Sequence, residues 1–163
     1  FSLCIIFAGN EVWILINNGM KRTLLSIALA IFAIGAVVAD GKPITVTQLP
    51  MKAQIFLKDY FAEVEVALVT QDDDLLYKDF EVALKNGTRI DFNSDGEWQE
   101  VAVKCGMVPS EIVPALVMQY VKEHYSGEHI MRIDRDRRGV EIELSNGLEL
   151  SFDRHYRLID IDD

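Results

Sequence analysis

Two distant stretches of the chain carry the same pattern of apolar and polar residues. Residues 81–92 read EVALKNGTRIDF and residues 141–152 read EIELSNGLELSF. In both stretches apolar and polar residues alternate on either side of an Asn-Gly pair, which is typical of two strands joined by a two-residue turn with positive φ at both turn positions. The repetition predicts one sheet unit that is present twice.

The first unit is predicted to begin with a helix over residues 50–61. After Leu49-Pro50, the apolar residues Ala53, Phe56, Leu57, Tyr60 and Phe61 follow the spacing of a single helical face. The alternation of apolar and polar residues predicts a first strand that contains Val64, Val66 and Leu68 and ends in an acidic turn at residues 71–74. Three more strands are predicted over residues 77–85, 88–93 and 97–105.

The second unit is predicted to have the same order of elements. Val108-Pro109 corresponds to Leu49-Pro50 in this reading, and a helix is predicted over residues 110–125, with Pro114 either delaying its start or kinking it. Four more strands are predicted over residues 130–134, 140–145, 148–153 and 157–161.

These elements predict an α+β fold, a tandem repeat of two helix-plus-four-stranded antiparallel sheet units over residues 44–105 and 106–163. A unit of this size is marginally stable alone, so the two units are expected to share a core. With one helix per unit, the helices can cover one face of the sheets, and the other face is expected to be open. Glu141, Glu143 and Glu149 take the open-face positions, while Ile142 and Leu150 take the core positions.

The N-terminal part has the features of an export signal. Residues 20–39 contain Lys21 and Arg22, an apolar run and a Val-Val-Ala end, which predicts a signal peptide cleaved after Ala39. A permanent membrane anchor is the alternative. Residues 1–19 lie upstream of a complete signal and are interpreted as a non-native leader. The mature chain is therefore expected to be periplasmic or secreted and not to be held in a membrane.

The charge of the chain narrows the class of partner. A formal net charge of −10 argues against nucleic acid and anionic membrane surfaces. The acidic residues of the open face suit a basic protein or a cationic ligand. The alternative is that they only keep a bare face soluble. The candidate partner-binding residues are Glu81, Trp98, Glu141, Glu143 and Glu149.

The position of Trp98 is open between two readings. Val101, Val103 and Cys105 claim the inward positions of their strand, which predicts a buried Cys105 thiol and sends Trp98 outward. A bulge near the Asp95-Gly96 turn would instead return Trp98 to the core.

Metal binding and catalysis have little support in the sequence. Residues 91–96, DFNSDG, match the first half of a calcium loop, but Ala102 stands where its final Glu belongs, and a hairpin turn is the other reading. Asp72, Asp73 and Asp74 form a second acidic run. The three histidines lack metal-ligand spacing. No catalytic signature is found, so we expect no enzyme, no metal centre and no cofactor.

The doubled Leu/Val-Pro helix, the hairpins at Asn86-Gly87 and Asn146-Gly147 and the segment FNSDGEW over residues 92–98 identify a resemblance. Residues 44–163 resemble the PepSY-like, β-lactamase-inhibitor-like family of secreted bacterial proteins. The resemblance implies tandem helix-plus-four-strand units and a periplasmic setting, and the molecular function of that family is largely unassigned. Residues 152–158, FDRHYRL, depart from the pattern because they lack the Asp-Gly turn and the Trp.

The functional reading of the sequence is thus a non-enzymatic binding or inhibitory module that uses its open acidic sheet face. The alternative is a divalent-cation sensor or buffer that collects calcium at Asp91, Asn93, Asp95 and the Asp72–Asp74 run.

Overall fold

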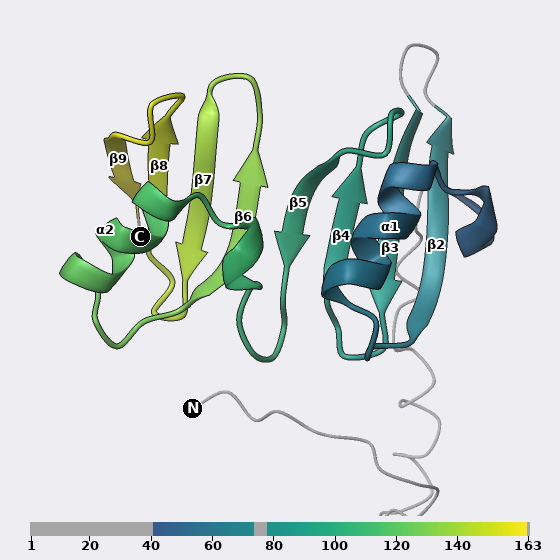
Figure 1. Cartoon of the computed structure of the whole chain (residues 1–163), viewed down its shortest axis with the longest axis horizontal. Helices are drawn as coiled ribbons and strands as arrows, with labels where there is room; N and C mark the ends of the chain where they lie inside the picture. Colours follow the sequence, from purple (N-terminus) through teal and green to yellow (C-terminus); the bar gives the residue numbers. More distant parts are fainter. Residues whose placement is uncertain (1–40, 74–77, 163) are drawn as a thin grey trace, which may run out of the picture. The chain divides into compact units, whose positions relative to one another are not determined.

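The computed structural model describes residues 41–73 and 78–162 of the chain (Figure 1). The predicted leader, signal peptide and cleavage site, together with Asp74, lie outside the described residues. No described helix is both long and apolar enough to span a membrane.

Each half of the described chain contributes one α-helix and four longer strands, with a short 3₁₀ turn before each helix. The first half contains β1 (Lys42–Pro43), η1 (Val46–Gln48), α1 (Met51–Tyr60), β2 (Val66–Asp73), β3 (Lys78–Leu84), β4 (Arg89–Phe92) and β5 (Trp98–Ala102). The second half contains η2 (Ser110–Ile112), α2 (Ala115–His124), β6 (Ile130–Arg135), β7 (Gly139–Leu144), β8 (Glu149–Asp153) and β9 (Leu158–Asp162).

The strands form a single antiparallel sheet whose spatial order, β1 to β9, is the order of the sequence. This corrects the prediction of two four-stranded sheets. The join lies between β5 and β6, where Val101 is opposite Ile133 and Glu100 is opposite Asp134. The physical reason is that an edge strand exposes unpaired backbone N–H and C=O groups, and pairing two edges satisfies both sets at once.

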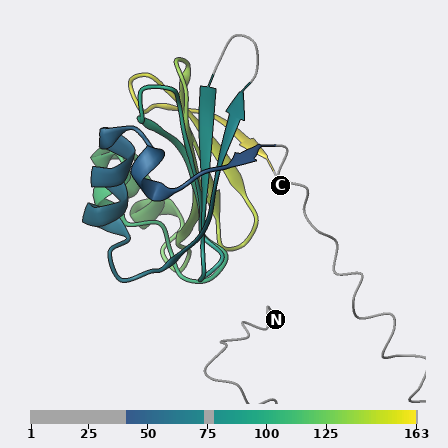
Figure 2. The ribbon, with the colours of Figure 1, turned by 90° about the vertical axis from the view of Figure 1, so that its right-hand side faces the viewer.

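Both helices lie on the same face of the sheet, as predicted (Figure 2). α1 starts directly after Pro50 and α2 directly after Pro114, so Pro114 delays the second helix to residue 115. In each half a 3₁₀ turn and then a buried residue, Leu49 or Val113, precede this proline. The structural counterpart of Leu49-Pro50 is therefore Val113-Pro114, and the sequence-based match to Val108-Pro109 is wrong.

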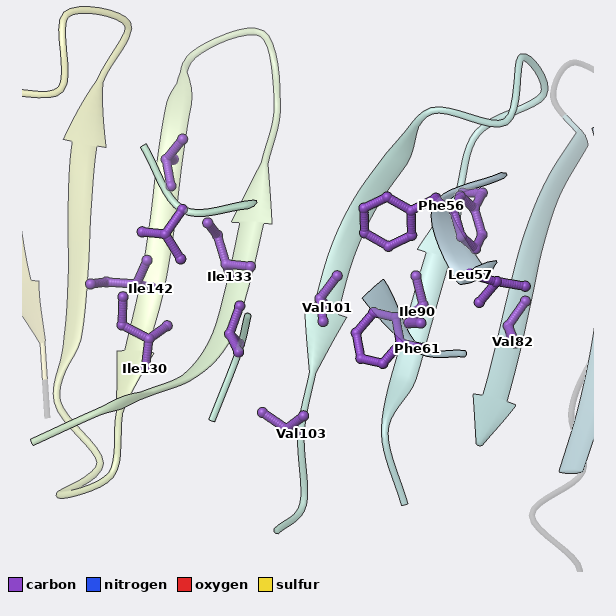
Figure 3. Close-up of a cluster of buried hydrophobic side chains, with 14 of the residues drawn as sticks. Phe56, Leu57, Phe61, Val82, Ile90, Val101, Val103, Ile130, Ile133 and Ile142 are labelled. Atoms are coloured by element: carbon purple, nitrogen blue, oxygen red, sulfur yellow. The ribbon is translucent and has the colours of Figure 1, made fainter. Parts of the chain in front are cut away.

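The core lies between the helices and the sheet and runs through both halves (Figure 3). Its centre is a transverse row of apolar residues, one from each strand from β2 to β8, in consecutive register: Val69, Val82, Ile90, Val101, Ile133, Ile142 and Leu150. All seven are buried. Aromatic edge-to-face pairs hold the helices on the sheet beside this row. Phe56 of α1 packs on Phe92 and Tyr120 of α2 packs on Phe152, each with ring centroids 5.6 Å apart.

Bulges change which residues face the core. In β2 a register shift between Val66 and Leu68 turns Leu68 outward and buries Val69, so the alternation read from the sequence fails there. A second shift, opposite Asp91 and Phe92, sets Trp98 opposite Phe92 on the helix side. The bulge reading of Trp98 is the correct one.

The predicted turns at the two Asn-Gly pairs have a different geometry. Gly87 has φ 85° and Gly147 has φ 88°, but neither Asn has positive φ. The N–H of each Gly donates to the carbonyl three residues earlier, Leu84 at 3.0 Å and Leu144 at 2.9 Å. These loops are therefore three-residue turns that end in a left-handed glycine, which is the next most common hairpin geometry. Each Asn instead accepts a backbone N–H with its side chain, from Thr88 or Leu148.

Cys105 was predicted to be buried, and the structure places it on the surface. β5 ends at Ala102, and the chain has left the sheet before residue 105. The inward alternation therefore holds for Val101 and Val103 but stops there.

Candidate functional site

The face of the sheet opposite the helices carries a transverse row of carboxylates, one residue away from the apolar row. Five adjacent strands, β3 to β7, each place an acidic residue in this row in direct cross-strand register: Glu81, Asp91, Glu100, Asp134 and Glu141. Ser151 and Asp160 continue it on β8 and β9. Directly opposed residues of antiparallel strands have Cβ atoms about 5 Å apart, so these like charges repel one another.

Two hollows on this face include members of the row. The first has a volume of 240 Å³ and is lined by Thr70, Asp72, Asp79, Glu81, Asp91 and Gln99, among others. The second has a volume of 210 Å³ and is lined by Asp134, Asp136, Gly139, Glu141, Ser151 and Ile159, among others. The two occupy corresponding positions in the two halves, and acidic side chains line both. Arg138 also lines the second hollow and pairs with Asp136 at 2.7 Å.

The electrostatics of the row are strained at Asp91. Burial, together with the charges of Glu100, Glu81 and Asp134, raises the pKa of Asp91 to about 6, against the opposing effect of Arg89. Its Oδ1 is buried without a hydrogen bond, and the nearest Arg89 nitrogen is 3.9 Å away. Burial, with the neighbouring Glu100, also raises the pKa of Asp134. A cation placed at the row would therefore lower the energy of both carboxylates.

Arg132 of β6 gathers three of the predicted partner-binding residues. Its Nη2 is 2.6 Å from Glu141 and 3.5 Å from Glu149, and its Nε is 3.8 Å from Glu143. Arg89 similarly pairs with Glu100 at 3.1 Å. The acidic face is thus partly neutralised by these two guanidinium groups.

The other two predicted residues lie apart from this cluster. Glu81 is exposed on β3 and borders the first hollow. Trp98 is on the helix side, half-buried against Phe56 at a centroid distance of 6.1 Å, so it does not join the open face.

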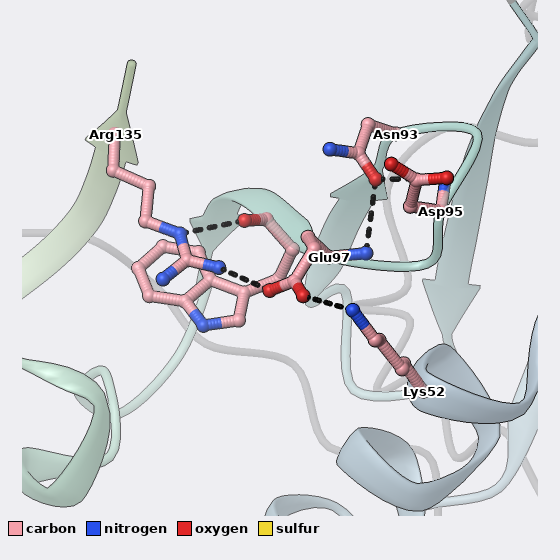
Figure 4. A network of polar contacts seen from close by, with 6 residues as sticks. Lys52, Asn93, Asp95, Glu97 and Arg135 are labelled. Carbon is pink, nitrogen blue, oxygen red and sulfur yellow. Dashed lines mark hydrogen bonds and ion pairs between the residues drawn. The ribbon is translucent and has the colours of Figure 1, made fainter. Parts of the chain in front are cut away.

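Trp98 belongs to a network that ties the two halves together (Figure 4). The guanidinium of Arg135, from β6, lies 3.9 Å from the Trp98 ring centroid, and its Nε donates to the Trp98 carbonyl at 2.7 Å. Arg135 also pairs with Glu97 at 3.5 Å, and Glu97 pairs with Lys52 of α1. The Trp98 side chain is therefore held by packing and by Arg135, and it does not lie on the open face where a partner is expected.

The calcium-like segment forms a hairpin turn. The Oδ1 of Asn93 accepts the N–H groups of Asp95 and Glu97, both at 3.0 Å, and Glu97 is held by its ion pairs. Within residues 41–73 and 78–162, no three His, Cys, Asp or Glu side chains are grouped so that they could hold a metal ion.

Sequence reasoning placed Glu81, Glu141, Glu143 and Glu149 on the open face, but it missed Glu100, Asp134 and both arginines, and it named Asp91 only as a candidate calcium ligand. The alternation within β4, β5 and β6 was the available signal. Asp91, Glu100 and Asp134 are the immediate chain neighbours of the buried Ile90, Val101 and Ile133, so each must face the opposite side of the sheet. Their alignment into one row depends on the β5–β6 join, which the sequence did not indicate.

Comparison with known proteins finds one family model and several similar solved structures. The family model described as "Putative beta-lactamase-inhibitor-like, PepSY-like" matches residues 78–160. No curated protein matches the chain.

Three solved structures are similar over nearly their whole length. A "putative periplasmic protein" of the DUF2874 family from Bacteroides vulgatus is 38% identical, with a TM-score of 0.74, and covers 77% of this chain and 99% of its own. A "putative calcium-regulated periplasmic protein" from Bacteroides thetaiotaomicron is 44% identical, with a TM-score of 0.74 and coverages of 76% and 98%. A "putative periplasmic protein of unknown function" from B. vulgatus is 32% identical, with a TM-score of 0.71 and coverages of 75% and 100%.

Proposed function

Because this chain belongs to the PepSY-like, β-lactamase-inhibitor-like family and resembles solved structures that are described as periplasmic, we propose that it is a periplasmic, non-enzymatic binding or inhibitory module. In this proposal it holds a cationic partner on its open sheet face. The observation that carries the proposal is the pair of acidic hollows joined by the carboxylate row. Each hollow is large enough for a Lys or Arg side chain, so the fitting partner is a basic protein surface.

The electrostatic repulsion within the carboxylate row favours a binding role over a role in solubility alone. A face that serves only solubility can alternate its charges, and opposed unlike charges stabilise a sheet. Here five adjacent strands oppose like charges, and Asp91 is held partly desolvated. A cationic partner would compensate that repulsion.

Charge reversal in both hollows tests the proposal. Glu81→Lys combined with Glu141→Lys places one cation at each hollow, and a partner recovered from periplasmic extract should bind at least about tenfold more weakly to this variant. The matched control, Glu63→Lys with Glu123→Lys, makes the same change in net charge away from the open face and should keep the partner.

Wild-type binding should also weaken with added salt. Equal capture of the partner by both double variants, or no specific partner for the wild type, contradicts the proposal and favours the solubility reading. Circular dichroism of each variant shows whether it is folded.

We also infer that the two halves are copies of one unit. Both halves have β-bulges at the same two places. One lies in the first long strand of each half, β2 or β6, and the other lies in the last strand of each half, β5 or β9. Residues 152–158, which lack the Asp-Gly turn, support the same inference. Tyr156 has φ 58° at the position that corresponds to Gly96, which has φ 76°. The side chain of Asp153 accepts two backbone N–H groups, as the side chain of Asn93 does.

A calcium response is the second candidate, because the solved structure that is 44% identical is described as calcium-regulated. Titration calorimetry with millimolar calcium tests it. Binding that disappears in Asp91→Asn but persists in Asp95→Asn would place the ion at the carboxylate row rather than at the hairpin turn. A flat trace, with no calcium-dependent change in melting temperature, excludes it.

A further inference from the structure

The outer edge of β9 differs in one respect from its counterpart in the first half. Residues 158–162 of β9 correspond to residues 98–102 of β5, because each strand follows the same bulge against the preceding strand. β5 pairs on its other side with β6, whereas the described sheet ends at β9. The internal β5–β6 junction is therefore a structural template for what would pair with β9.

The exposure of the central residues shows what the β9 edge lacks. Val101 of β5 is 0% exposed, and Ile161 at the corresponding position of β9 is 46% exposed. On β6 it is Ile133 that lies opposite Val101. Ile159, the bulge residue beside this edge, is also exposed. An incoming strand with an apolar side chain opposite Ile161 would extend the buried row by one strand.

One backbone N–H at the outer edge of β9 is bonded to a side chain of the same strand. Across β5 and β6, the N–H of Val103 donates to the Met131 carbonyl at 2.8 Å, and alternation directs the N–H of Val101 to the same edge. At the corresponding position of β9, the N–H of Ile161 donates to Oδ1 of Asp160 at 3.0 Å. This local bond occupies a donor that a strand would otherwise use, which is one way in which proteins protect an edge.

The charge of the edge selects the occupant. Asp160 and Asp162 flank Ile161, and Glu149 is opposite Asp162. A second copy of the chain, paired β9 to β9 about Ile161, would set Asp160 against Asp162 twice, so charge disfavours it. In the β5–β6 junction, Arg132 lies opposite Ala102, and the β9 counterpart of Ala102 is Asp162. Arg135 of β6 covers Trp98, and the β9 counterpart of Trp98 is Leu158. A strand that paired with β9 as β6 pairs with β5 would therefore place its basic residues at Asp162 and Leu158.

We propose that the outer edge of β9 binds an extended segment of another protein by strand addition, and that this segment has an apolar residue opposite Ile161 flanked by Arg or Lys. The proposal rests on the correspondence between the halves and not on binding at the open face.

The probe is a fluorescent peptide that copies residues 129–136 with Asp134→Asn. Fluorescence anisotropy should show binding to the full chain, and amide chemical shifts should change mainly at residues 158–162. The same peptide with N-methyl groups on the amides that would face β9 should bind at least about tenfold more weakly, because strand addition depends on those hydrogen bonds. Ile161→Pro, which removes the edge donor, should weaken binding similarly.

The open-face variant separates the two proposals. Glu81→Lys with Glu141→Lys should leave peptide binding nearly unchanged if β9 is the site. Loss of binding in that variant but not in Ile161→Pro, or equal binding of the N-methylated peptide, overturns strand addition and leaves the open face as the site. The absence of binding at millimolar peptide concentration also overturns strand addition. A dimer seen in ultracentrifugation and abolished by Ile161→Pro overturns it too, because a second copy of the chain then occupies the edge.

Discussion

At the scale of single residues, Asp91 combines a structural cost with the proposed role. Its carboxylate lies between Glu81 and Glu100 in cross-strand register, and its side chain is 35% exposed. Desolvation disfavours its charged form, and Arg89 relieves this only in part because it also pairs with Glu100.

We expect Asp91→Asn to stabilise the protein at neutral pH. In the folded protein the pKa of Asp91 is about 6, above the ordinary 3.8, so the folded state binds its proton more tightly than the unfolded state does. Wild-type stability should therefore fall as the pH rises from about 4 to about 6. The substitution should flatten this part of the curve and add about 1 kcal/mol at pH 7, after discounting for solvent screening.

Urea unfolding at a series of pH values measures this effect. Asp95→Asn, in the hairpin turn outside the carboxylate row, is the control for the loss of one carboxylate. An unchanged slope between pH 4 and 6 in Asp91→Asn would show that Asp91 titrates normally.

Two glycines with the same backbone conformation are expected to differ in tolerance. Gly96 and Gly147 both have positive φ, but a Cβ on Gly96 would lie 2.7 Å from Cβ of Pro50, whereas a Cβ on Gly147 meets nothing within 4 Å. Gly147→Ala should cost about 1 kcal/mol from the backbone conformation alone. Gly96→Ala should cost roughly 1 to 3 kcal/mol more, because the start of α1 must shift.

Denaturant midpoints of the two alanine variants test this difference. Equal losses of stability would mean that the turn at Gly96 does not press on α1.

At the scale of elements, alternation and spacing predicted both helices and all eight longer strands to within a few residues. They failed where a bulge shifts the alternation, as at Leu68, since a bulge leaves no local mark in the sequence. They also missed the β5–β6 pairing, because pairing depends on which edge remains free after each half has folded. The candidate site was found only in part for the same reason, since Asp91 and Asp134 become neighbours of Glu100 through that pairing.

The contact of Arg135 with Trp98 should be a main source of stability at this junction. Arg135→Ala removes the stacking and the bond to the Trp98 carbonyl and should cost about 1 to 3 kcal/mol. Arg135→Lys should lose most of the same stability, because an ammonium group lacks the planar stacking surface. Trp98 fluorescence should respond in both variants.

Arg138→Ala serves as the control. Arg138 is 91% exposed and pairs only with Asp136 among the contacts described, so its loss should change stability by less than about 0.5 kcal/mol. A similar loss in both alanine variants would remove the special role of Arg135.

At the scale of the whole molecule, a core shared by two halves in one sheet predicts a single cooperative unfolding transition. The halves contribute neighbouring members of the same buried row, Val101 and Ile133, which should not separate without exposing each other.

Export should leave a mature chain that begins at Asp40. Mass spectrometry of the protein from the periplasm of a Gram-negative host should give the mass of residues 40–163. The control, Ala39→Arg, should block processing, because the cleavage site requires a small residue. A periplasmic protein that begins at Met20 would favour the anchor reading.

The alternation of the buried apolar row with the carboxylate row also has a consequence for folding fidelity. Each interior strand from β3 to β7 carries an acidic residue directly beside its central core residue. A strand that paired one residue out of register would turn its carboxylate into the helix-covered interior and its apolar residue into water. Such a mispaired sheet would bury little apolar surface, so the mispaired strands would dissociate quickly. The same charges that we propose to face a partner therefore also disfavour mispaired strands while the sheet assembles.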